Sequence, residues 1–118
     1  MKKVILVFFL TAFNAGCATQ QPTYYWGNYE SLLYTSYALP GEASPDLQIA
    51  TITSDIQKAE AEGKPVPPGI HAHLGMMYVA AGNMEQAHVA FMQEKTLYPE
   101  STVLIDGIIE RGFQGSEQ

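Results

Sequence analysis

This chain of 118 residues has one cysteine, one tryptophan and six basic residues. A single cysteine excludes a disulfide within the chain, so the fold depends on an apolar core of modest size. Lys and Arg are outnumbered by 12 acidic residues, which gives a net charge of −6. This shortage of cations argues against nucleic-acid binding, because such binding depends on neutralising phosphates. It argues equally against electrostatic adhesion to anionic lipid.

The longest apolar run covers residues 4–13, follows the basic pair Lys2 and Lys3, and stops at Asn14. A transmembrane helix needs about 20 predominantly apolar residues, and a buried core helix would show an amphipathic pattern. The run fits neither alternative. A basic start followed by a short apolar block is typical of a secretory signal peptide, which we predict over residues 1–16.

The cysteine, Cys17, comes directly after the small pair Ala15 and Gly16. This arrangement resembles the lipobox of bacterial lipoproteins, although Asn14 stands where that family has Leu or another aliphatic residue. The resemblance implies cleavage before Cys17 and lipidation of its thiol. Ala18 in place of aspartate implies sorting to the outer membrane, with the protein facing the periplasm. The alternatives are cleavage elsewhere and a secreted soluble protein with one free thiol.

Cleavage before Cys17 would remove Lys2 and Lys3, so the net charge would change from −6 to −8. We expect residues 17–23 to be a lipidated polar tether, residues 24–113 to be a single folded domain, and residues 114–118 to be a polar tail. Membrane contact would then come from the acyl chains rather than from charge, and more than one chain gives stable anchoring.

The apolar periodicity of the remaining chain predicts an all-α fold of about five helices. Their expected ranges are 28–38, 44–62, 69–81, 84–97 and 101–112. The start and stop signals are Ser44 as an N-cap before Pro45, Gly63 as a stop, Asn83 with Gln86 as a capping box, and Ser101 and Gly112 at the two ends of the last helix. We find no alternation typical of a strand.

The third and fourth expected helices share a set of small and aromatic residues at fixed spacing. The set is Leu74, Gly75, Tyr78, Ala87, Phe91 and Pro99. This spacing resembles one tetratricopeptide repeat (TPR), a hairpin of two helices, with departures at His71, where the repeat has Trp, and at Glu94, where it has a small residue. Gly75 and Ala87 would let the helices approach closely. The resemblance implies that the fifth helix caps a short array and that the first two form a degenerate repeat.

The whole chain also resembles a family of small bacterial lipoproteins of unknown function. The resemblance rests on the Cys17 start, on the aromatic segment 25–29 and on the single TPR-like hairpin. Such lipoproteins are often encoded beside a lipoprotein similar to the curli secretion channel. The resemblance therefore implies a place in an envelope complex, with that channel-like lipoprotein as a candidate partner, and it implies no activity.

The three histidines do not predict a metal site. His71 and His73 are two residues apart, which places them about 200° apart around a helix, and His88 lies on the next helix. No serine has a recognisable adjacent base, as nucleophilic catalysis requires. We therefore predict no metal, no cofactor and no enzymatic activity.

Two surfaces are candidates for binding a partner. The first is the aromatic segment, with Tyr25, Trp26 and Tyr29, whose rings offer large contact areas but could instead form core. The second comprises Ala72, Met76 and Val79, which the TPR resemblance places on the concave side of the array. No Lys or Arg occurs between Pro65 and Glu94, so we expect a groove ligand to be apolar or basic.

The function we predict is that of an outer-membrane lipoprotein acting as a periplasmic protein–protein interaction adaptor or assembly factor of an envelope complex. The alternative is a structural lipoprotein subunit that assembles with copies of itself. Dependence of molecular size on dilution would separate the two, and the sequence leaves the oligomeric state open.

Overall fold

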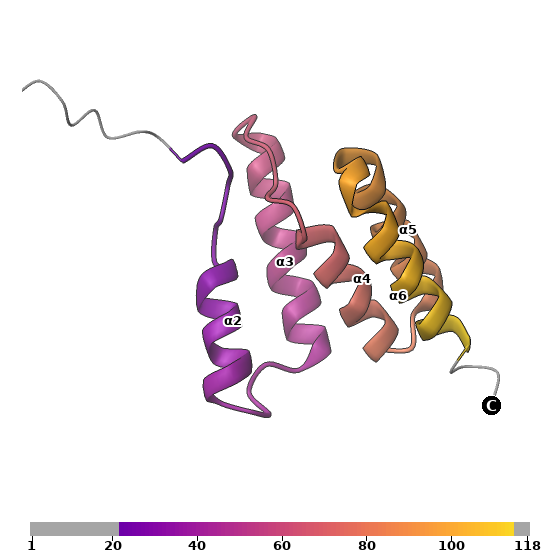
Figure 1. Cartoon of the computed structure of the whole chain (residues 1–118). Helices are drawn as coiled ribbons and strands as arrows, with labels where there is room; N and C mark the ends of the chain where they lie inside the picture. The colour runs from indigo at the N-terminus through magenta and orange to yellow at the C-terminus, as the bar shows by residue number, and fades with distance from the viewer. Residues whose placement is uncertain (1–21, 115–118) are drawn as a thin grey trace, which may run out of the picture.

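The computed structural model describes residues 22–114 and, within them, the side chains up to residue 112. This part of the chain is all α-helical, as predicted, with five α-helices, one 3-10 turn and no strand. The helices are α2 (Tyr29–Ala38), α3 (Pro45–Ala61), α4 (Ile70–Ala80), α5 (Met84–Leu97) and α6 (Thr102–Gln114), with the turn η2 at Pro99–Ser101. Figure 1 shows α2, α3 and α4 side by side in chain order, followed by α5 with α6 beside it.

Three helix ends follow the predicted signals. The Ser44 hydroxyl accepts the Leu47 N–H at 3.3 Å, directly before Pro45 at the first position of α3. Gly63 ends α3 in the left-handed conformation, with φ of 63°, and the Lys64 N–H donates to the Ala59 carbonyl at 2.9 Å, as in a Schellman motif. The Asn83 side chain accepts the Gln86 N–H at 3.2 Å and so caps α5.

The last helix begins directly after Ser101, as predicted, but neither Ser101 nor Gly112 has the role expected of it. Ser101 lies in η2, and its hydroxyl is 3.4 Å from Glu94 Oε1 instead of capping a helix. The helix α6 begins at Thr102 and continues through Gly112 to Gln114. Gly112 does not adopt a positive φ. An isolated glycine weakens a helix by about 1 kcal/mol without ending it, so the prediction that Gly112 stops the helix is wrong.

The core consists of two connected clusters. The first joins α2, α3, α4 and α5 through Leu32, Ile52, Ile70, Leu74 and Ala90. The second joins α4, α5 and α6 through Ala72, Ala87, Phe91 and Ile105. Tyr78 is half-buried and packs against both clusters, so it connects the two halves of the array.

The helices α4 and α5 pack closely at Gly75. A Cβ atom on Gly75 would lie 2.5 Å from Cε1 of Phe91, whose side chain is fully buried. Glycine is therefore required for this packing, and the close approach predicted at Gly75 is confirmed. Ala87 is also fully buried, whereas Pro99 is exposed and begins η2, where α5 has ended.

A buried carboxylate holds the start of α4. Its N-cap residue, Gly69, has no side chain to accept the free N–H groups of the first turn. Glu94 from α5 is fully buried and takes this role, because its Oε1 accepts the Gly69 N–H at 2.7 Å and its Oε2 accepts the Ala72 N–H at 3.3 Å. A negative charge at this end also complements the helix dipole. The departure from the repeat pattern at Glu94 thus has a structural reason.

Candidate functional site

The aromatic segment before α2 is held to α3 by Asp55, whose side chain is buried. The Asn28 N–H donates to Asp55 Oδ2 at 2.7 Å, and the Asn28 side-chain amide donates to Oδ1 at 3.1 Å. The preceding residue, Gly27, has a φ of 50°, and a Cβ atom there would lie 2.5 Å from the Asp55 carboxylate. The turn that leads from Trp26 into α2 therefore needs both a glycine and this aspartate.

Replacing Gly27 with alanine is expected to destabilise the protein more than the same change at Gly63. Both glycines have a positive φ, so both variants carry a backbone penalty of about 1 kcal/mol. Nothing lies within 4 Å of a Cβ at Gly63, whereas a Cβ at Gly27 meets Asp55, which adds roughly 1–2 kcal/mol of steric strain. Urea unfolding followed by circular dichroism measures the difference. Equal losses would show that Asp55 does not hold this turn.

A chain of hydrogen bonds joins α2, α3 and α4 beneath the aromatic segment. Tyr29 Oη lies 2.8 Å from His73 Nδ1, and His73 Nε2 lies 2.9 Å from Gln48 Oε1. The Gln48 amide nitrogen donates to the Ala43 carbonyl at 2.8 Å, so Oε1 is the acceptor for His73. We therefore assign the proton to His73 Nε2 and the acceptor role to Nδ1, which receives the Tyr29 hydroxyl.

Burial lowers the pKa of both His71 and His73, although Glu94 and Glu60 oppose the shift at His71. The unfolded chain therefore binds these protons at a higher pH than the native protein does. The two histidines therefore make their full contribution to the free energy of unfolding above the pKa of histidine in the unfolded chain, about 6.5. This contribution decreases as the pH falls below that value.

We expect the free energy of unfolding, obtained from urea titrations, to decrease as the pH is lowered from 7.5 to 5.5, by at most about 1.4 kcal/mol per pH unit for each histidine. His73→Gln should reduce this dependence. A pH dependence that is the same in the wild-type protein and in His73→Gln would contradict this role of His73.

Trp26 directly precedes Gly27 in the turn that Asp55 holds, and it is 50% exposed. Its carbonyl accepts the Tyr29 N–H at 3.0 Å, and on its other side the Tyr25 N–H donates to the Pro65 carbonyl at 3.0 Å. Trp26, Tyr29, Glu30 and Leu33 line an open cavity of about 350 Å³, here called the aromatic cup. An exposed indole on a fixed backbone is a ready contact surface, because little conformational freedom is lost on binding.

A second hollow, of about 390 Å³, lies between α4 and α6. Met76 and Val79 line it from α4, and Ile108, Arg111 and Gly112 line it from α6. The expectation of an apolar or basic ligand depended on the absence of Lys and Arg between Pro65 and Glu94. Arg111 lies outside that stretch, on α6. The groove therefore combines apolar walls with one positive charge, which the sequence reasoning missed because it considered the hairpin alone.

The two hollows share one side of the helix array. The rings of Tyr29 on α2 and His73 on α4 meet edge to face, with centroids 5.5 Å apart, and Met76 follows His73 by nearly one turn of the same helix. We call the surface formed by the aromatic cup and the α4–α6 groove the α2–α4–α6 face.

The other residues predicted to bind a partner are placed differently. Ala72 is buried in the second core cluster with Phe91 and Ile105, so its methyl group fills core and offers no surface. Tyr25 is half-buried. On α2, Tyr37 lies about two turns after Tyr29 and is 83% exposed.

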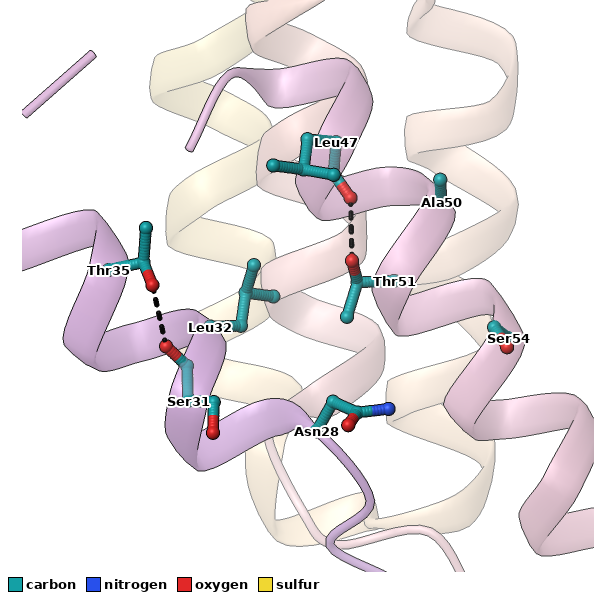
Figure 2. A pocket seen from close by; sticks show the side chains of 8 residues that line it. All are labelled: Asn28, Ser31, Leu32, Thr35, Leu47, Ala50, Thr51 and Ser54. Carbon is teal, nitrogen blue, oxygen red and sulfur yellow. Dashed lines mark hydrogen bonds between the residues drawn. The ribbon is translucent and has the colours of Figure 1, made fainter. Parts of the chain in front are cut away.

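A shallow hollow of about 470 Å³ lies between α2 and α3, on residues that the prediction did not include (Figure 2). Four of its side chains are hydroxyls, namely Ser31, Thr35, Thr51 and Ser54. The Thr35 and Thr51 hydroxyls donate to the carbonyls of Ser31 and Leu47 in their own helices, as Figure 2 shows with dashed lines. Two of the four hydroxyl donors of this hollow are therefore already used within the helices.

No metal centre is formed by the described residues: within 22–114 no three His, Cys, Asp or Glu side chains gather in a way that could hold an ion. Within the same residues, no helix is long and apolar enough to cross a membrane. Cys17, the predicted signal peptide 1–16 and most of the tether 17–23 lie outside the described residues, as do residues 115–118 of the tail.

The molecule is thus an all-α array of short helices with an exposed aromatic cup and an apolar groove on one face. The chain belongs to the family described as a domain of unknown function (DUF4810), which matches residues 23–108. That span includes the aromatic segment and ends within α6. Neither a curated protein nor a solved structure matches the chain significantly.

Proposed function

We propose that this protein is a lipid-anchored adaptor that holds partner proteins at the periplasmic side of the outer membrane. Acyl chains on Cys17 would provide the anchor, and the α2–α4–α6 face would provide the contacts. The mechanism is binding without chemistry. Confinement to the membrane raises the effective concentration of partners without any additional contact.

One observation carries the proposal: Trp26 is half-exposed although hydrogen bonds fix the backbone on both sides of it. An indole held in place loses little conformational freedom when a partner covers it, and Trp is enriched among the residues that dominate binding energy at interfaces. The neighbouring groove adds Met76, whose flexible thioether side chain adapts to varied ligands.

We also propose that α4 and α5 form a TPR-like hairpin and that α2, α4 and α6 line its concave side. The support is the spacing from Leu74 to Pro99 together with the close approach of Gly75 and Phe91. In this arrangement the first helix of each pair faces the ligand. A lipoprotein similar to the curli secretion channel is the first partner to test, because lipoproteins that resemble this chain are often encoded beside one.

The test is a pull-down from membranes with the wild-type protein beside Cys17→Ser, Trp26→Ala and Val89→Ala. Val89 is a matched control, because it is exposed but lies on α5 and lines the groove toward α3. We expect a stable partner set with wild type and Val89→Ala, and loss of that set with Cys17→Ser and Trp26→Ala. Circular dichroism must show that each variant is folded. A partner set that all four proteins retain would contradict the proposal.

The alternative function is a self-assembling structural subunit, and a specific observation supports it. The exposed apolar side chains include Tyr34 and Tyr37 on α2 and Val103 and Leu104 on α6, the first and last of the described helices, and Val103 is 85% exposed. Stacking of one end of the array on the other end of a second copy would cover both. Under this alternative the apparent mass rises with concentration, and Val103→Asp abolishes the rise.

A further inference from the structure

The aromatic cup combines two chemical features that suit a cation. Trp26 and Tyr29 supply aromatic rings, and Glu30 supplies an exposed carboxylate at the same cavity of about 350 Å³. A Lys or Arg side chain over an indole is attracted by the negative face of the ring, and Trp is the strongest of the aromatic partners. Leu33 completes the wall and can contact the aliphatic stem of such a side chain.

The surrounding charge favours the same ligand. From residue 22 to residue 57 the chain has four acidic residues, Glu30, Glu42, Asp46 and Asp55, and no Lys or Arg. Asp55 is occupied by Asn28, whereas Glu30 has no hydrogen bond or ion pair among those formed by the described side chains. A positively charged partner would therefore be attracted to this end of the face and would find a free carboxylate there.

The cup is also formed in advance of binding. The Asp55–Asn28 hydrogen bonds fix the turn before α2, and the Tyr29 hydroxyl is held by His73. A preorganised site loses little entropy when a ligand enters. The turn at Gly27, which the Asp55 hydrogen bonds hold, thus fixes the backbone of Trp26 close to Glu30.

We propose that the aromatic cup binds a Lys or Arg side chain from a basic segment of a partner protein. The cation lies against the Trp26 ring and pairs with Glu30, while its stem packs on Leu33. This inference rests on the adaptor function proposed above and adds the chemistry of the partner. A bilayer surface is the competing occupant of an exposed tryptophan, but interfacial segments usually carry Lys or Arg, and residues 22–57 contain neither.

Trp26 is the single tryptophan of the chain, so its fluorescence reports on the cup alone. The acylated full-length protein in neutral detergent is titrated with the peptide Ac-Ala-Lys-Ala-Lys-Ala-amide and with the same peptide acetylated on both lysines. We expect a saturable change with the first peptide, weakened by salt, and a response at least about fivefold weaker with the second.

The matched variants are Glu30→Gln and Glu42→Gln. Both replace an exposed carboxylate in the same part of the chain, but only Glu30 lines the cup. Glu30→Gln should weaken binding about five- to tenfold, and Glu42→Gln should change it by less than about twofold. Equal binding of the two peptides, or equal effects of the two variants, would overturn the cation site. A shift of Trp26 emission when the Cys17→Ser protein meets phosphatidylcholine vesicles would also overturn it, in favour of a bilayer.

The two proposals can fail separately. If the membrane pull-down recovers a partner and Glu30→Gln retains it, the adaptor function stands and the cation site is wrong. If the peptide titration follows the expected pattern but no partner is recovered from membranes, the cation site stands and the adaptor function is wrong.

Discussion

Replacing Glu94 with alanine is expected to lower the free energy of unfolding by about 3 kcal/mol. The carboxylate is fully buried and accepts the N–H groups of Gly69 and Ala72, at the start of a helix whose own cap residue has no side chain. Without it, the Ala72 N–H, which is buried, and the Gly69 N–H, which is partly buried, lose their acceptor, and a cavity remains between α4 and α5. Urea unfolding followed by circular dichroism measures the loss.

Two further variants at acidic positions make this prediction specific. Glu94→Gln keeps one oxygen as an acceptor but turns an amide N–H₂ group toward the second donor, so we expect roughly half the loss. Glu100→Ala removes an exposed carboxylate from η2 and should change stability by less than about 0.5 kcal/mol. Similar losses for Glu94→Ala and Glu100→Ala would show that the buried carboxylate does not hold α4.

Replacing Gly75 with valine is expected to cost about 3 kcal/mol through overpacking. A Cβ atom at this position would lie within 3 Å of three atoms of the Phe91 ring. That ring is fully buried, so it has nowhere to move unless α4 and α5 separate. The unfolding midpoint in urea should fall accordingly, and the near-ultraviolet circular dichroism of the core should weaken.

Gly112→Val is the matched control, since Gly112 also lies within a helix and nothing is within 4 Å of its Cβ position. We expect a change of less than about 1 kcal/mol there. Adding Phe91→Leu to Gly75→Val should recover part of the loss, because the two side chains compete for one space. Additive losses in the double variant would mean that the ring is not what limits the size of residue 75.

Local signals were sufficient to predict most of the helices. Ser44, Gly63 and Asn83 act as the capping chemistry requires, because a cap depends on residues a few positions away in sequence. The contact of Gly75 with Phe91 was also predictable, since the spacing of small and aromatic residues in one hairpin is itself a local pattern. Gly112 was misassigned because a glycine alone does not end a helix.

The buried polar contacts could not be assigned to partners from the sequence. Asp55 contacts Asn28, 27 positions earlier, and Glu94 contacts Gly69, 25 positions earlier, so no local rule pairs them. A weaker signal was present. Asp55 follows Ile52 by three residues and Glu94 follows Phe91 by three, so each acidic residue lies on an otherwise apolar stripe of its helix. A charge in that position predicts burial with a partner.

The candidate site could be predicted only in part, because it too depends on contacts between residues that are distant in sequence. The aromatic segment stood out by its composition, but whether Trp26 faced core or solvent depended on Asp55, which lies on another helix. Ala72 and Met76 are on one helix four residues apart, yet only Ala72 is buried, in the core cluster that α4 forms with α5 and α6. Arg111 joins the groove by the same packing of α6 against the hairpin.

The proposed adaptor function requires that a partner bind at the α2–α4–α6 face. The most direct test places a photo-crosslinking amino acid at Met76 or at Val89 in the full-length protein, in cells. Both residues are exposed on the same helical hairpin, but Met76 lines the groove with α6 and Val89 lines the groove with α3. We expect a discrete crosslinked species from Met76 that is absent from Val89 and is lost with Cys17→Ser. A partner captured from Val89 and not from Met76 would contradict the proposed binding face.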